Sequence, residues 1–272
     1  MTARASSPLR VRTNHVEWVA ERLSERDRTI LATVERLRLV TGAQLERLHF
    51  ADLATPSRAR SRRRVLARLV AWRVLLRLER RIGGVRAGSS GLVFALDTTG
   101  VRLAQLAAHL DDASSPRRTG EPSVALLAHT LAVTELYVSL VELARSGGFD
   151  VSDYLTEPSC WQPNGYGGWL KPDAYLKLSS AQFDDYWWIE TDKGTEHLPT
   201  IRRKLGVYLD YVNAGGSGPQ GVTPRVLVTV PSEARRAAVA ELIRRLPEPA
   251  SALLHAVTEE RAPEYLLRVL GE

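Results

Sequence analysis

The chain has 272 residues, of which 44% are hydrophobic and 25% charged, with a net charge of +6, a composition typical of a globular protein of one or two domains. Its single cysteine, Cys160, excludes an internal disulfide framework and a cysteine-rich zinc site. No continuous apolar run approaches the roughly 18 residues of a membrane span, and residues 1–18 lack the apolar core of a secretory signal. We therefore expect a cytoplasmic protein with no membrane partner.

The charge is divided unevenly between the two halves of the chain. Residues 1–120 contain 23 Arg, no Lys and 11 acidic residues, a balance of +12, whereas residues 121–272 contain 14 basic and 20 acidic residues, a balance of −6. A basic half of this kind is expected to contact a polyanion. The alternative is an arginine-rich composition whose charged faces are only solvated.

Three helices are predicted in the basic half. Residues 27–38 carry apolar side chains at helical spacing. Thr41 and Gln44 fit a capping box at the start of a second helix, and Thr55 followed by Pro56 begins a third. Three apolar residues of the third helix are expected to face the core: Leu66, Leu69 and Val70.

Two strands and a further helix follow. Residues 74–81 and 92–97 are predicted strands on either side of a glycine-rich connection. Three helices followed by a β-hairpin predict a winged helix, a variant of the helix-turn-helix. Asp97 or Thr98 is expected to cap the next helix. The predicted boundaries are a flexible N-terminus, the winged helix and a linker, at residues 1–20, 21–110 and 111–122.

Arginines are concentrated on and after the third helix, the element that enters the major groove in a winged helix. Ten arginines and one acid, Glu79, lie between residues 58 and 81. Because fixed positive charge binds phosphates and the arginine fork binds guanine, we expect a nucleoid-associated protein whose partner is double-stranded DNA. RNA is a less expected partner, because it would call for exposed aromatic residues among the arginines, and no such aromatic platform is predicted here. The expected DNA-binding residues are Arg58, Arg60, Arg62, Arg63, Arg64, Arg68, Arg77, Arg80, Arg81 and Arg86.

The acidic half predicts a mixed-sheet α/β domain over residues 123–272, which makes the whole chain α+β. The expected order is helix, three strands, helix, strand and helix, at residues 123–146, 151–160, 171–178, 186–192, 198–212, 225–230 and 232–246. Residues 161–169 are expected to be a loop, and residues 264–270 an edge strand or a closing helix.

Two of these strands bring acidic residues together. Strands joined by a short connection normally pair as an antiparallel hairpin, which places Asp173 opposite Glu190 and Asp192. Glu190 and Asp192 share a face because they are two residues apart. Three neighbouring carboxylates repel one another unless they are neutralised, and hard oxygen ligands suit Mg²⁺ or Mn²⁺. The alternative is that residues 186–198 form the ordinary end of a buried strand.

The acidic half resembles the PD-(D/E)xK nuclease fold. The resemblance is carried by Pro172 and Asp173, a strand, and Glu190 on the next strand, with Glu135 where that family has an acid on its first helix. It implies carboxylates that hold Mg²⁺ and a lysine that positions the attacking water.

This chain departs from the nuclease pattern at the lysine. Asp192 occupies the position of the family's lysine, and Lys193 lies one residue later. Lys204, on the following helix, is the other residue that would supply the charge. The candidate catalytic residues are Glu135, Asp173, Glu190, Asp192, Lys193 and Lys204. The candidate metal ligands are Asp173, Glu190 and Asp192.

A second resemblance covers nearly the whole chain. A winged helix followed by "LDTTGVRLAQL", "HTLAVTELYVSL" and "IETDKGTE" with "IRRKLGVYLDY" resembles the replication-relaxation family of actinobacterial plasmids and mobile elements. Membership implies a role in the replication or DNA relaxation of such an element. Two functions stay open: a Mg²⁺-dependent DNA endonuclease or nickase, and a transcriptional regulator or replication-initiation factor whose nuclease-like domain is inactive.

Several other chemistries are not expected. The sequence has no P-loop motif, so no nucleotide cofactor is predicted. No two histidines lie within ten positions of each other, which excludes the paired-histidine metal site of nicking relaxases. A homodimer that matches a palindromic site is compatible with the sequence, although no heptad pattern requires one.

Overall fold

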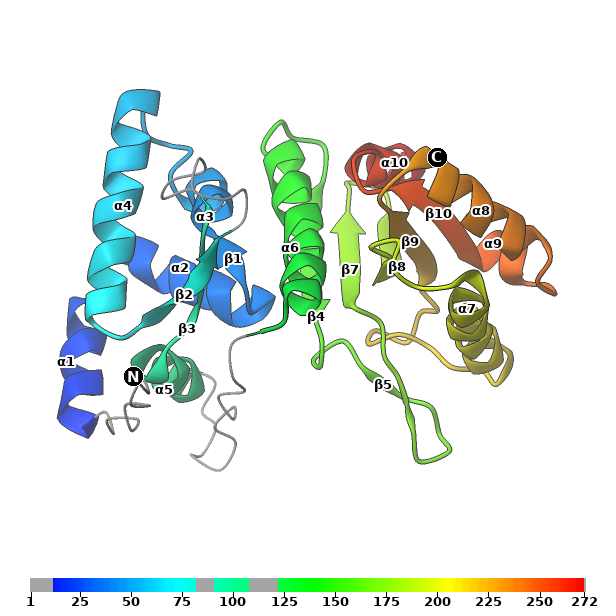
Figure 1. Ribbon diagram of the computed structural model, residues 1–272, viewed down its shortest axis with the longest axis horizontal. Helices are drawn as coiled ribbons and strands as arrows, with labels where there is room; N and C mark the ends of the chain where they lie inside the picture. The colour runs from blue at the N-terminus through cyan, green and yellow to red at the C-terminus, as the bar shows by residue number, and fades with distance from the viewer. Residues whose placement is uncertain (1–11, 82–90, 108–121, 272) are drawn as a thin grey trace, which may run out of the picture. The chain divides into compact units, whose positions relative to one another are not determined.

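The computed structural model describes residues 12–81, 91–107 and 122–271 (Figure 1). The chain divides into two compact units, Met1–Glu121 and Pro122–Glu272, and each is treated by itself. Both combine helices with β-strands, so the predicted α+β class is confirmed.

The N-terminal unit packs helices on a small antiparallel sheet. Its strands lie in the order β1-β3-β2. The strand β1 was not expected, because it has only two residues and is identified by its pairing with β3. The elements in chain order are α1 (Thr13–Arg22), α2 (Glu25–Leu37), β1 (Val40–Thr41), α3 (Gly42–His49), α4 (Thr55–Ala71), β2 (Leu75–Arg81), β3 (Leu92–Leu96) and α5 (Thr98–Ala107).

Side-chain caps mark the start of two of these helices. Ser24 and Asp27 form a capping box on α2, and Thr41 and Gln44 form the predicted capping box on α3. The start of α4 differs by one residue from the prediction. Its N-cap is Ala54, whose side chain makes no capping bond, and Thr55 is already helical.

The helix α1 corrects the expectation of a flexible segment up to residue 20. Val16 and Val19 of this helix are buried, and the helix packs against α5. The ring of Trp18 meets the ring of Trp72 edge to face at 5.5 Å between centroids. These apolar contacts hold the segment from residue 13 onward.

The C-terminal unit is built on a mixed five-stranded sheet with the order β10-β9-β8-β7-β4. The pairs β4–β7 and β7–β8 are antiparallel, and the pairs β8–β9 and β9–β10 are parallel. The elements are α6 (Val124–Ala144), β4 (Asp150–Thr156), β5 (Gln162–Pro163), β6 (Trp169–Leu170), β7 (Ala174–Ser179), β8 (Asp184–Thr191), α7 (Leu198–Asn213), β9 (Arg225–Val230), α8 (Glu233–Arg244), α9 (Ala250–Leu253), β10 (Leu254–Thr258) and α10 (Ala262–Leu270).

Helices cover both faces of this sheet. Trp187 and Trp188 are both fully buried and, as neighbours on a strand, point to opposite faces. The ring of Trp187 meets Tyr265 of α10, and the ring of Trp188 meets Tyr208 of α7. Each face therefore has its own aromatic core, and β8 runs between them.

Three segments differ from their predicted state. The β7–β8 hairpin forms, but Ser179 pairs with Asp184, so its connection is shorter than expected. The predicted loop over residues 161–169 contains the β5–β6 hairpin. The edge of the sheet is β10, which the sequence did not predict, whereas residues 264–270 form the helix that was one of their two predicted states.

Among the described residues, α6 is long and apolar enough to cross a membrane by length and composition, with a mean hydropathy of 1.7 over its best window. Length and apolar composition alone are weak evidence for a membrane span, because the core helix of a soluble domain has both. In this chain α6 packs against β4, β8 and α10, and His129, Glu135 and Glu142 interrupt its apolar sequence.

Candidate functional site

Three of the expected DNA-binding arginines are held by contacts with other residues of the N-terminal unit. Arg62 is buried and its guanidinium lies 3.0 Å from the carboxylate of Glu46. Arg58 donates hydrogen bonds of 3.0 and 3.2 Å to two carbonyl oxygens between α3 and α4. Arg68 donates to both carboxylate oxygens of Asp27, at 2.7 and 2.6 Å, and Asp27 is fully buried. These three arginines hold α4 against its neighbours.

Three other arginines of α4 face outward. Arg60, Arg63 and Arg64 are exposed, and none forms an ion pair or hydrogen bond with another described residue. Their spacing of three and four residues puts them on one side of the helix. Arg77 on β2 is also exposed, and its side chain forms no ion pair or hydrogen bond with another described residue. The remaining expected residues lie outside the side chains that the structure describes: Arg80, Arg81 and Arg86.

In the C-terminal unit, Asp173 and Glu190 come from adjacent strands. Ala174 pairs with Ile189, so the antiparallel register brings Asp173 alongside Glu190, as the sequence predicted. The backbone N–H of Thr191 donates to Oδ2 of Asp173 at 2.7 Å. This hydrogen bond fixes the Asp173 carboxylate at the end of β8.

Glu190 is buried at the same place. The hydroxyl of Tyr208 on α7 donates a short hydrogen bond to its Oε1. Burial, together with repulsion from Asp173, raises the pKa of Glu190 to about 8. The carboxyl therefore holds a proton around neutral pH unless a positive charge joins it.

A small cavity adjoins Glu190. It has a volume of about 20 Å³, and Thr191, Glu196 and Lys204 are among the residues that line it, so it has room for one water-sized group. Nζ of Lys204 lies 2.7 Å from the carboxylate of Glu196. Burial lowers the pKa of Lys204, but the bond to Glu196 and the nearby Glu190 carboxyl more than offset this and raise it. Lys204 is thus a protonated cation at the pocket.

Asp192 and Lys193 form ion pairs with other residues, and Asp192 also lines the cavity beside Glu190. Nε of Arg235 donates to Asp192 at 2.6 Å, and Nζ of Lys193 donates to both carboxylate oxygens of Glu259, at 2.8 and 3.0 Å. Within the described ranges, no group of three or more His, Cys, Asp or Glu side chains is arranged to hold a metal ion. The strand register brings Asp173 alongside Glu190, whereas the third predicted carboxylate, Asp192, lines the cavity beside Glu190 and is paired with Arg235.

The sequence missed His129. Its Nε2 lies 3.1 Å from Oδ1 of Asp173, and this hydrogen-bonded pair raises the pKa of His129 above its ordinary value. Glu135 lies six residues further along α6, about 240° around the helix, and so on a different face. The rotation of α6 about its own axis determines which of its residues faces Asp173. No local sequence signal gives that rotation.

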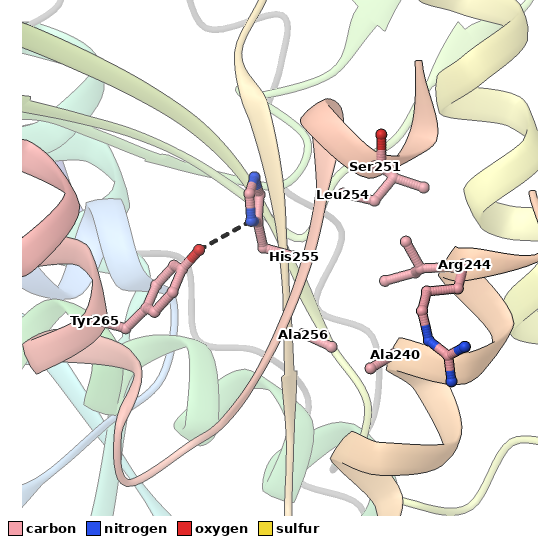
Figure 2. Close-up of a pocket in the computed structure, with 8 residues that line it drawn as sticks. Ala240, Arg244, Ser251, Leu254, His255, Ala256 and Tyr265 are labelled. Atoms are coloured by element: carbon pink, nitrogen blue, oxygen red, sulfur yellow. Dashed lines mark hydrogen bonds between the residues drawn. The ribbon is translucent and has the colours of Figure 1, made fainter. Parts of the chain in front are cut away.

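A separate pocket of about 260 Å³ lies beside the edge strand β10 (Figure 2). Arg244 of α8, Ser251 of α9 and Tyr265 of α10 line it. Tyr265 hydrogen-bonds to Nδ1 of His255 at 2.9 Å, and burial lowers the pKa of His255. None of the candidate residues from the sequence lines this pocket.

These features define an α+β protein with an arginine-bearing helical unit and a sheet unit that holds a pair of neighbouring carboxylates, of which Glu190 is buried. The family model for replication-relaxation matches residues 31–226, which extend from α2 to β9. The chain therefore belongs to the replication-relaxation family, as its sequence resemblance indicated. No match was found among curated proteins or among solved structures.

Proposed function

We propose that the N-terminal unit is a winged helix that binds duplex DNA through the exposed face of α4. The order α2, β1, α3, α4, β2, β3, with β3 between β1 and β2 in the sheet, supports a winged helix in which α4 would be the third helix. In such folds this helix enters the major groove. The observation that carries the proposal is the unpaired row of Arg60, Arg63 and Arg64.

The separation of the α4 arginines into a bound set and a free set supports this proposal. If the arginines of α4 served only to solvate the helix, we would not expect one set to bind neighbouring residues and another set to lie free on one face. Arg58, Arg62 and Arg68 bind the N-terminal unit itself. The free set provides the fixed positive charge that phosphate contacts require. With the family membership, this supports a role in the replication or DNA relaxation of a plasmid or mobile element.

Fluorescence anisotropy with a labelled duplex tests the proposal. The triple variant Arg60→Ala, Arg63→Ala, Arg64→Ala should bind the duplex at least tenfold more weakly than wild type. The matched control removes the same charge from α8 of the other unit, through Arg236→Ala, Arg244→Ala and Arg245→Ala. Equal affinities in the two triple variants would contradict the proposal, since net charge alone would then explain binding.

A second candidate function, metal-dependent DNA cleavage, is favoured by the Asp173–Glu190 pair. Neighbouring carboxylates, one of which (Glu190) lines a cavity of water size, fit a hard cation such as Mg²⁺ or Mn²⁺. The raised pKa of Glu190 supports this candidate, because a cation would compensate both for the burial of the carboxylate and for its repulsion from Asp173. Bound there, a divalent cation would polarise a phosphodiester group and stabilise the charge of its transition state.

The residues of this chain would then divide the remaining tasks. Asp173 and Glu190 would hold the cation. His129 and the Thr191 N–H orient the Asp173 carboxylate. Lys204, a protonated cation at the same cavity, would take the place of the lysine that the nuclease pattern puts at residue 192. Asp192 and Lys193 would keep their ion pairs with Arg235 and Glu259.

Supercoiled plasmid incubated with Mg²⁺, Mn²⁺ or EDTA tests this second function. Wild type should nick or linearise the plasmid only with the metal ion, and Asp173→Asn and Glu190→Gln should not. Wild type that binds DNA without cutting it under any of these conditions would identify the C-terminal unit as an inactive nuclease-like domain. The chain would then act as a DNA-binding regulator or replication-initiation factor.

A further inference from the structure

The β5–β6 hairpin presents aromatic side chains to solvent. Tyr166 at its tip is 85% exposed and Trp169 on β6 is 53% exposed. Leu170 between Trp169 and Lys171 is buried in the core beneath α7. The alternation of a strand therefore turns Trp169 and Lys171 outward together. We name residues 161–171 the aromatic arm.

The arm is a fixed structure. Oδ1 of Asn164 accepts hydrogen bonds from the backbone N–H groups of Tyr166 and Gly168, at 3.0 and 2.9 Å. The N–H of Asn164 donates to the carbonyl oxygen of Gly168 at 3.0 Å. Gly165 and Gly167 have positive φ angles of 77° and 79°, which glycine adopts without strain. The exposed rings are thus held on an ordered turn, where rigid presentation lowers the entropy cost of binding.

Positive charge accompanies these rings. Nζ of Lys171 lies 4.6 Å from the ring centroid of Trp161, and no acidic residue lies between Glu157 and Asp173. The strand β6 packs against α7, whose Arg202 and Arg203 are exposed and have no partner among the described residues. Exposed aromatic rings and exposed cations on elements that pack together complement a ligand with flat apolar faces and a negative backbone.

We propose that the aromatic arm binds single-stranded DNA by stacking unpaired bases on Tyr166 and Trp169, with Lys171, Arg202 and Arg203 near the phosphates. The rings can stack on bases only where the bases are unpaired, since bases in a duplex are already stacked on one another. The arm thus recognises a melted or displaced strand, a ligand different from the duplex assigned to α4. The inference rests on the proposed function in one respect, that DNA is the ligand.

The test uses the full chain and a labelled oligonucleotide of about 20 nucleotides without self-complementarity. Tyr166→Ala with Trp169→Ala should weaken binding of this single strand at least tenfold, because each stacked base contributes about 1–3 kcal/mol. Tyr166→Phe with Trp169→Phe keeps two flat rings and should bind within about threefold of wild type. Phe183→Ala is the matched control, since Phe183 is an exposed aromatic residue, at 54%, in the β7–β8 connection away from the arm.

The same measurements in the Arg60→Ala, Arg63→Ala, Arg64→Ala background separate the two sites. If that triple variant loses duplex binding and keeps arm-dependent binding of the single strand, both proposals stand. Full duplex binding by the triple variant would refute only the α4 proposal. The arm inference is overturned if the double alanine variant binds the single strand as wild type does. It is also overturned if wild type is a dimer and the double variant a monomer with unchanged affinity, since the arm would then join two copies of the chain.

Discussion

Glu190→Gln should stabilise the C-terminal unit at alkaline pH and leave its stability at pH 5 almost unchanged. Glutamine has the shape of a protonated glutamate, and its side-chain oxygen can accept the hydrogen bond that Tyr208 donates to Glu190. The substitution removes only the ionisable group. A buried carboxyl normally weakens a fold where it must ionise, so its replacement by a neutral group of equal size should be favourable there.

The sign and size follow from the shifted pKa. Burial first and Asp173 second raise the pKa of Glu190 from an ordinary 4.5 to about 8. Below pH 4.5 the carboxyl is protonated in both folded and unfolded chains, and the full stability is present. As pH rises towards 8 the unfolded chain ionises more readily than the folded one, and stability falls. At about 1.4 kcal/mol per pKa unit, the loss is at most about 5 kcal/mol.

Urea unfolding followed by tryptophan fluorescence measures this effect, because Trp187 and Trp188 lie on the same strand as Glu190 and are fully buried. The free energy of unfolding of wild type should fall between pH 5 and pH 8.5, and that of Glu190→Gln should fall much less. Glu248→Gln, at an exposed glutamate, is the control and should follow wild type. Parallel pH profiles for wild type and Glu190→Gln would refute the reasoning, because Glu190 would then ionise in the folded chain at its ordinary pKa.

Three further predictions test other contacts. Arg68→Met should lower the free energy of unfolding of the N-terminal unit, measured by urea titration, by about 3–5 kcal/mol, because it leaves the buried Asp27 carboxylate without its cation. Asp27→Asn should lower it less, since the freed Arg68 can reach solvent. Equal losses in the two variants would contradict this account. Gly100→Ala should destabilise this unit by roughly 1–3 kcal/mol in thermal unfolding, because a Cβ there would lie 2.2 Å from the carbonyl oxygen of Val74; an unchanged midpoint would show that the backbone gives way. If the chain cleaves plasmid DNA, Lys204→Ala should abolish cleavage and Lys193→Ala should not, because only Lys204 lines the cavity beside Glu190; the opposite pattern on a gel would move the role to Lys193.

Local signals in the sequence located most elements of the fold. Capping boxes and apolar periodicity are chemistry of neighbouring residues, so the start of α3 at Thr41 and the buried strand β9 were predictable. Elements held mainly by distant partners were not. The two-residue β1 and the edge strand β10 are defined by their pairing with β3 and β9, and α1 is held by contacts with Trp72 and α5.

In the candidate site, too, local sequence signals predicted only the contacts between residues close in the chain. Pairing in the β7–β8 hairpin follows from its short connection, so the meeting of Asp173 with Glu190 was predictable from spacing. Which other charges join them depends on helix phase and on neighbours distant in the chain. His129 reaches Asp173 from α6, and Arg235 of α8 takes up Asp192. Likewise, the ten-arginine cluster could not be divided into internal and external sets until α4 was packed against α2 and α3.

The salt dependence of duplex binding tests the central claim, that α4 contacts DNA phosphates through Arg60, Arg63 and Arg64, most directly. Each phosphate contact adds about 0.9 to the slope of log affinity against log salt concentration. The triple alanine variant should therefore show a slope smaller than that of wild type by roughly 2–3, whereas removal of three arginines from α8 should leave the slope unchanged. A slope that is the same for wild type and the α4 variant would contradict the account and place the DNA contacts elsewhere on the chain.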